Sequence, residues 1–140
     1  EDLVASIHVG AEIASSPMAT INDLGPGAII SDFGNNAGLV IGPEISGWQA
    51  RYHDPIDITV DVNGAIVGSI TRSIGDDALA AFDFLVGLSV ARGLAIPAGS
   101  YITCGALSGI HDITPGAESN VVFGGLAEFS VSFARRYPTT

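Results

Sequence analysis

The chain has 140 residues, which suits a single domain of ordinary size. It is 47% hydrophobic and only 14% charged, so it has enough apolar residues for a core and does not resemble a disordered segment. A net charge of −10, with no lysine, argues against binding to nucleic acid or to an anionic membrane surface, because both need clustered cations. No apolar run reaches the roughly 20 residues of a membrane span.

The chain contains one cysteine, Cys104, so it has no internal disulfide framework, and we expect a cytoplasmic protein. Cys104 stands between Thr103 and Gly105 in an apolar stretch, which is more typical of a small buried residue than of a nucleophile. The low charge density also predicts that part of the apolar surface is an interface, either with another subunit or with a further segment. We therefore expect a homo-oligomer.

The first third of the chain predicts little regular structure. Residues 1–9 favour a short helix that ends at Gly10, and Ile13 is expected in a strand. Residues 15–27 are rich in Ser, Asn, Asp, Pro and Gly, which is typical of a loop. Two short apolar runs, 28–30 and 39–41, then flank a polar middle.

The clearest local pattern lies at residues 56–69. Apolar residues alternate with polar ones from Ile56 to Val62, as in a strand with one buried face. Asn63 and Gly64 favour the positive φ angles of a two-residue hairpin turn, so residues 65–69 are predicted to return as the partner strand.

A helix is predicted over residues 76–92. Asp76 or Asp77 is the expected cap, and Arg92 and Gly93 suit the end of the helix. Its expected buried face carries four apolar side chains, namely Leu79, Phe82, Val86 and Val90. Two further strands, around 121–123 and 129–133, are expected on either side of Gly124-Gly125. The pattern as a whole predicts one α+β domain over 1–140, dominated by β-structure and with one main helix.

Several stretches together resemble one known family. They are VGAEIASSP (9–17), SDFGNNAGLVIGPEISGW (31–48), VNGAIVGS (62–69), ARGL (91–94) and IPAGSYITCGALSGIHDITPGAESNVVFGGLAEFSVSF (96–133). In order and spacing they are similar to the C-terminal catalytic portion of the fumarylacetoacetate hydrolase superfamily. The likeness is greatest to the branch that contains 2-keto-4-pentenoate hydratases and 4-oxalocrotonate decarboxylases. It implies a mixed β roll or sandwich packed with one main helix.

The resemblance also implies a chemistry. In the family, three carboxylates hold Mg²⁺ or Mn²⁺, which chelates the oxygens of a small 2-oxo or 2-hydroxy acid and stabilises an enolate. We accordingly expect a lyase that adds water to a 2-hydroxy-2,4-dienoate in aromatic or steroid ring catabolism. Two alternatives stay open: a 2-oxo-3-enedioate decarboxylase of the same branch, and a non-catalytic half-domain that assembles with a partner.

Six residues match functional positions of the family. Glu12 matches a metal ligand and Asp32 a catalytic residue, and the residues expected to contact substrate are Asn35, Asn36, Thr103 and Ser108. Turn or cap chemistry explains Asp32 and the two asparagines equally well. The family's other two metal ligands form a Glu-x-Glu motif, and its catalytic residues include a lysine. This sequence contains neither, so we expect them in an upstream segment.

The three histidines show no metal-ligand spacing. His111-Asp112 is compatible with a general base, but a locally hydrogen-bonded loop residue is the simpler interpretation.

Overall fold

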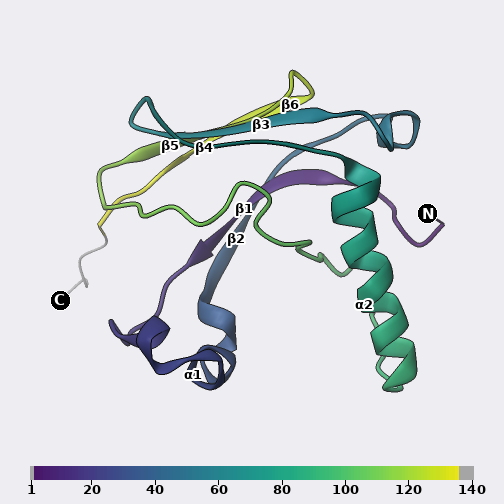
Figure 1. The fold of residues 1–140 in the computed structure, drawn as a ribbon, viewed down its shortest axis with the longest axis horizontal. Helices are drawn as coiled ribbons and strands as arrows, with labels where there is room; N and C mark the ends of the chain where they lie inside the picture. The colour runs from purple at the N-terminus through teal and green to yellow at the C-terminus, as the bar shows by residue number, and fades with distance from the viewer. Residues whose placement is uncertain (1, 136–140) are drawn as a thin grey trace.

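The computed structural model describes residues 2–135, which form two antiparallel sheets and one main helix. The larger sheet has the strand order β4-β3-β5-β6, and the smaller one pairs β1 with β2. Strands β1 and β2 cross beneath the larger sheet and extend away from it toward the short helix α1, while α2 leaves the same sheet at its other end (Figure 1). The β-dominated α+β fold expected from the sequence is confirmed.

The predicted hairpin forms the centre of the larger sheet. Strand β3 (Ile56–Val62) pairs with β4 (Ala65–Arg72), and the turn between them has φ of 52° at Asn63 and 80° at Gly64. The apolar residues of β3 are buried and face the β1-β2 pair, so the alternation in the sequence marks the inner and outer faces correctly.

The C-terminal strands are confirmed as well. Strand β5 (Glu118–Phe123) pairs antiparallel with β3, and β6 (Ala127–Ser132) pairs with β5. Gly124 and Gly125 both have positive φ in the turn between them. Their placement explains how the end of the chain returns to the hairpin in the middle of the sequence.

The helix expected over residues 1–9 is wrong. Strand β1 runs His8–Ala14 and pairs with β2 (Asn36–Glu44), and the described residues before it form no helix. Val9, only 1% exposed, belongs to the core, and a Cβ on Gly10 would lie 3.1 Å from the carbonyl oxygen of Val40. Tertiary packing on β2 therefore outweighs a weak local helix preference, and Gly10 serves close strand packing rather than helix termination.

The polar connection between these strands contains short helical turns. They comprise a 3-10 turn at Ile21–Leu24, the helix α1 (Pro26–Ser31) and a 3-10 turn at Phe33–Asn35. The loop predicted for residues 15–27 therefore holds only for its first part. Pro26 occupies the first turn of α1, where its missing N–H is not needed.

The main helix begins earlier than predicted. A π-helical turn, Ile74–Leu79, continues into α2 (Ala80–Ala91). Ser73 caps it, accepting a hydrogen bond from the backbone N–H of Asp76, so the cap expected at Asp76 or Asp77 is wrong. The C-terminal end at Arg92 and Gly93 is confirmed.

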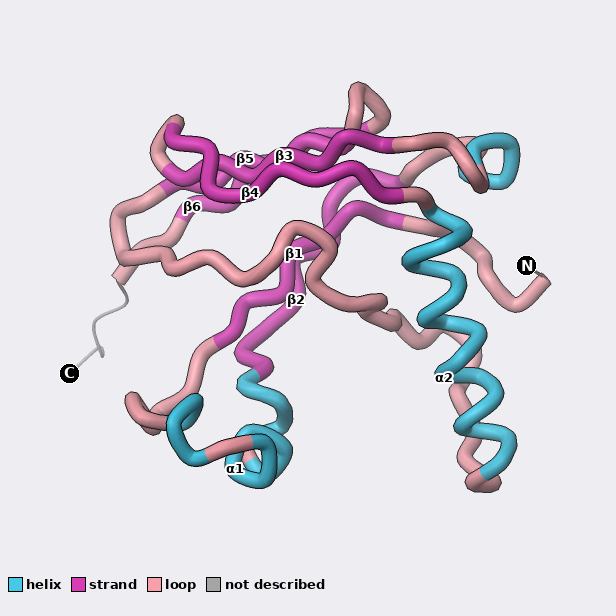
Figure 2. Tube along the Cα trace, in the orientation of Figure 1, coloured by secondary structure: helices cyan, strands magenta, loops and turns pink. Residues whose placement is uncertain are grey.

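The core is small for a chain of this length. It joins the two sheets through six buried side chains, Val9, Ile45, Trp48, Ile56, Ile58 and Ile74. The accessible surface is 9538 Å², whereas a folded monomer of 14.2 kDa exposes roughly 6,800 Å². Figure 2 shows the reason: α1 and α2 extend from the sheets at separate places and do not pack on each other. No helix within residues 2–135 combines the length and apolar character needed to cross a membrane.

Candidate active site in the central hollow

A large open hollow lies between the sheets and α2, with a volume of about 1290 Å³. We call it the central hollow; its walls are β1, the inner side chains of β3, one side of α2 and the segment 96–113. Protein interiors normally contain few voids larger than a water molecule. The hollow is therefore either a binding site or a space that further polypeptide fills.

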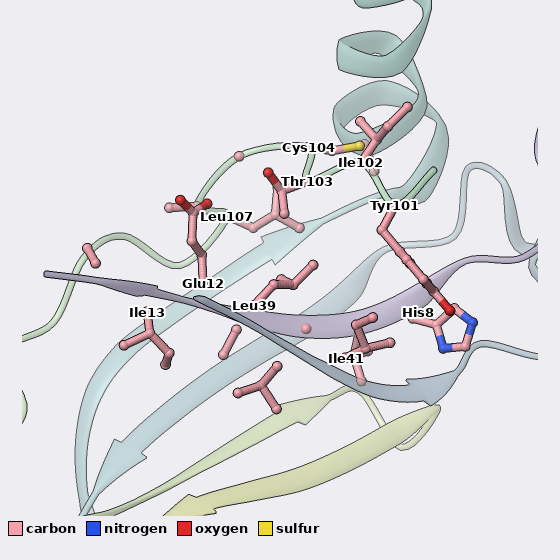
Figure 3. A pocket seen from close by; sticks show the side chains of 18 of the residues that line it. His8, Glu12, Ile13, Leu39, Ile41, Tyr101, Ile102, Thr103, Cys104 and Leu107 are labelled. Carbon is pink, nitrogen blue, oxygen red and sulfur yellow. The ribbon is translucent and has the colours of Figure 1, made fainter. Parts of the chain in front are cut away.

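Glu12 lies on the wall formed by β1, opposite Leu39 of β2. Its carboxylate extends from the strand toward the segment that carries Thr103 and Leu107 (Figure 3). Oε1 accepts a 2.9 Å hydrogen bond from Nδ2 of Asn36. Two of the residues singled out from the sequence are thus in direct contact, 24 positions apart in the chain.

Asn35 and Asp32 lie near the start of β2 but differ in their surroundings. Asn35 lines the central hollow, donates from Nδ2 to Oδ1 of Asn22 at 3.2 Å, and leaves its buried Oδ1 without a hydrogen bond. Asp32 caps the C-terminal end of α1 and is not among the residues of the hollow's wall. The structure therefore brings Asn35, but not Asp32, to the same space as Glu12.

Thr103 and Ser108 lie on the opposite wall, in the segment 96–113, which has no helix or strand. Cys104 lies between them in sequence and is half-buried, and this burial raises the pKa of its thiol. A protonated thiol is a poor nucleophile, so the structural interpretation of Cys104 still holds.

Sequence reasoning missed three aromatic side chains on the walls of the hollow. The rings of Tyr101 and His8 meet edge to face, with centroids 6.5 Å apart, and His8 Nδ1 lies 3.1 Å from the carbonyl oxygen of Gly42. His111 lies over Gly68 of β4, and its buried Nε2 has no hydrogen-bond partner. No spacing in the sequence indicates these positions, because the chain only brings them together through the crossing of its two sheets.

A divalent metal ion does not fit the described residues alone. Within residues 2–135, no three His, Cys, Asp or Glu side chains come close enough to hold one. Glu12 supplies a single carboxylate, and its one side-chain contact is a neutral amide. Hard dications are usually held by several oxygen ligands, so further ligands must come from outside this set.

No family model matches the chain, and no curated protein matches it in sequence. Its fold is similar to that of 4-oxalocrotonate decarboxylase from Pseudomonas putida G7, solved in complex with calcium and acetate, with a TM-score of 0.63 at 22% identity. The alignment covers 76% of this chain and 41% of that enzyme, so the chain spans less than half of its length. This likeness confirms the expected fold, a β-rich roll or sandwich with one main helix.

Proposed function

We propose that the chain carries part of the active site of a metal-dependent lyase that acts on a small 2-oxo or 2-hydroxy acid. Hydration of a 2-hydroxy-2,4-dienoate is the leading reaction. The observation that carries the proposal is the position of Glu12, whose carboxylate faces an open hollow in a fold shared with a 4-oxalocrotonate decarboxylase.

The walls of the hollow suit such a substrate. Apolar side chains from β1, β2 and α2 would surround a short unsaturated carbon chain. The hydroxyl of Thr103 and the amide of Asn35 are the polar groups that this chain offers to a substrate carboxylate. Asn36 would act through Glu12, since its amide fixes one carboxylate oxygen and leaves the other for a ligand.

The proposal requires additional carboxylates, because the described residues contain one of the three that the resemblance implies. We place them in an upstream segment, which would enter the central hollow. A non-catalytic half-domain stays the alternative if no such segment exists.

Decarboxylation of a 2-oxo-3-enedioate is the second candidate, and the fold shared with a 4-oxalocrotonate decarboxylase favours it. The two reactions differ in substrate, because the enedioate carries a second carboxylate that the protein must bind.

One experiment tests these possibilities together. Turnover of 2-hydroxypentadienoate and of 4-oxalocrotonate, with added Mn²⁺, is measured for the 140-residue chain and for its extended reading frame. Loss of ultraviolet absorbance reports consumption of each substrate, and released CO₂ identifies decarboxylation. We expect activity in the extended protein only, and a large loss in Glu12→Gln, which keeps the shape of the side chain but removes its charge.

Glu128→Gln is the matched control, because Glu128 is an exposed acid on β6 that does not line the hollow. It should leave turnover unchanged. Equal activity in Glu12→Gln and the unaltered protein would refute the role of Glu12. Inactivity of the extended protein on both substrates would favour the half-domain.

A further inference from the structure

Helix α2 exposes a continuous apolar stripe. Four residues at helical spacing, Ala80, Phe84, Gly87 and Ala91, are solvent-exposed and lie on one side of the helix. Val90 borders this side, and Leu94, just past the helix end, extends it. Phe84, Val90 and Leu94 are 71%, 75% and 62% exposed, which is unusual for large apolar side chains in one patch.

The other side of α2 already faces the rest of the molecule. Phe82, Val86 and Ser89 line the central hollow, and of these Ser89 is fully buried. Val90 was predicted to belong to this buried face, and its exposure corrects that prediction. The helix is thus apolar on both sides, and a helix of that kind is normally covered all round.

The stripe is self-complementary about Gly87. Phe84 and Val90 are the bulkiest exposed side chains of the helix, and each is three residues from Gly87. If two copies of α2 cross antiparallel at Gly87, Phe84 of each copy lies level with Val90 of the other. A Cβ built on Gly87 would have no neighbour within 4 Å, so the midpoint is open to close approach by another helix.

The charges on α2 select the antiparallel arrangement. Asp83 lies near the start of the helix and Arg92 caps its end, and both are exposed. In an antiparallel pair Asp83 of one copy lies within about one residue rise, roughly 1.5 Å along the axis, of Arg92 of the other. A parallel pair would instead place the two aspartates side by side and the two arginines side by side, which is unfavourable.

The area available is sufficient for a dimer. The accessible surface exceeds that of a typical monomer of this mass by more than 2,000 Å² on the size scaling above. A standard interface removes only about 800 Å² from each partner. The interface is also isologous, as a two-fold dimer requires, because one patch serves both copies.

We propose that the stripe of α2, defined by Ala80, Phe84, Gly87, Ala91 and the bordering Val90 and Leu94, is the interface through which two copies of this chain form an antiparallel two-fold dimer. The proposal is independent of the chemistry in the central hollow, which lies on the other side of the helix.

The mass of the 140-residue chain in solution, measured by sedimentation and light scattering at micromolar concentration, gives the first test. We expect a dimer whose dissociation constant rises roughly tenfold or more in Phe84→Glu and in Val90→Glu, since each change places two charges in the apolar interface. Ile66→Glu is the control, because Ile66 is equally exposed, at 70%, but lies on β4. It should leave the dimer intact.

Two further variants identify the geometry. Asp83→Arg and Arg92→Asp should each weaken the dimer, and the double variant should restore it, because only an antiparallel pair exchanges these charges between copies. In a Cys104→Ser background, Gly87→Cys should form an interchain disulfide on mild oxidation, whereas Ile66→Cys should not. Circular dichroism verifies that each variant is folded.

A monomer at tens of micromolar would overturn the proposal. So would a dimer that is insensitive to Phe84→Glu and shows no crosslink at residue 87, because another face would then hold the copies together. If the extended reading frame is monomeric and protects the 87 position from modification, a segment of the same chain covers the stripe, and the proposal is equally refuted.

Discussion

Asn36 and Glu12 are diagonal neighbours on one face of the β1-β2 pair. Asn36 is opposite Ala14 in the register, two residues beyond Glu12, and its Nδ2 donates a 2.9 Å hydrogen bond to Glu12 Oε1. The contact links the first residue of β2 to the wall of the central hollow. It therefore orients the one carboxylate of the proposed site.

We expect Asn36→Ala to reduce function without reducing stability. The bond is solvent-exposed, so the free energy of unfolding should change by no more than about 0.5 kcal/mol. Loss of a residue that orients a metal ligand typically lowers metal affinity or activity about 10- to 100-fold. Mn²⁺ titration and turnover of the extended protein measure the effect.

Asn22→Ala is the control for this variant, because it removes the partner of Asn35 and not that of Glu12. If Asn36→Ala and Asn22→Ala lower Mn²⁺ affinity equally, the orienting role of Asn36 is wrong.

Gly42 joins the two sheets, and we predict that a methyl group there is not tolerated. A Cβ on Gly42 would lie 2.9 Å from Cδ1 of Phe129 on β6 and 3.0 Å from the carbonyl oxygen of Val9 on β1. Gly42→Ala should therefore lower the free energy of unfolding by about 1–3 kcal/mol, as overpacking does. Urea denaturation gives the value.

Gly38 offers a matched comparison in the same strand. Nothing lies within 4 Å of a Cβ built there, so Gly38→Ala should be neutral or slightly stabilising. Equal destabilisation by both substitutions would show that the sheets are not packed as described.

The cap of the main helix should give a pH-dependent contribution to stability. Ser73 Oγ donates to Oδ2 of Asp76 at 2.8 Å and accepts from its backbone N–H, and this hydrogen bond, aided by His53, lowers the pKa of Asp76. A carboxyl group with a lowered folded pKa stabilises the protein above its unfolded pKa of about 3.9, and the contribution is lost as pH falls through the folded value.

Ser73→Ala should lower the free energy of unfolding by about 1 kcal/mol at neutral pH. Asp76→Asn should remove the part of the stability that depends on pH below about 4. Thermal unfolding between pH 3 and 7 tests both, and an unchanged acid dependence in Asp76→Asn would count against the assigned cause.

The sequence predicts those elements whose signals are local. The alternation of β3 and the Asn63-Gly64 turn specify a hairpin by themselves, and the structure contains it at the predicted residues. The start of β1 could not be predicted in this way, because Val9 becomes a strand residue only through its partner β2 and the core beneath it.

The same reasoning applies to the candidate site. The resemblance indicated Glu12, Asn35 and Thr103, which do line one hollow, but it also indicated Asp32, which does not. His111 was set aside because it has no partner in sequence, and its place over Gly68 depends on how the segment 96–113 crosses β4. Contacts between distant segments leave no periodic pattern in a single sequence.

The last prediction concerns the thiol of Cys104, which lines the central hollow beside Thr103. Burial raises the pKa of this thiol, so the fraction of reactive thiolate at pH 8 is smaller than in the unfolded chain. Iodoacetamide should therefore alkylate the native protein several-fold more slowly than the urea-unfolded protein, and the two rates should converge as pH rises above the raised pKa. A small 2-oxo acid bound in the hollow should slow the native reaction further, whereas an amine of similar size should not. Mass spectrometry of the labelled chain follows both reactions, and equal native and unfolded rates at pH 8 would show that the segment 96–113 does not bury this side chain.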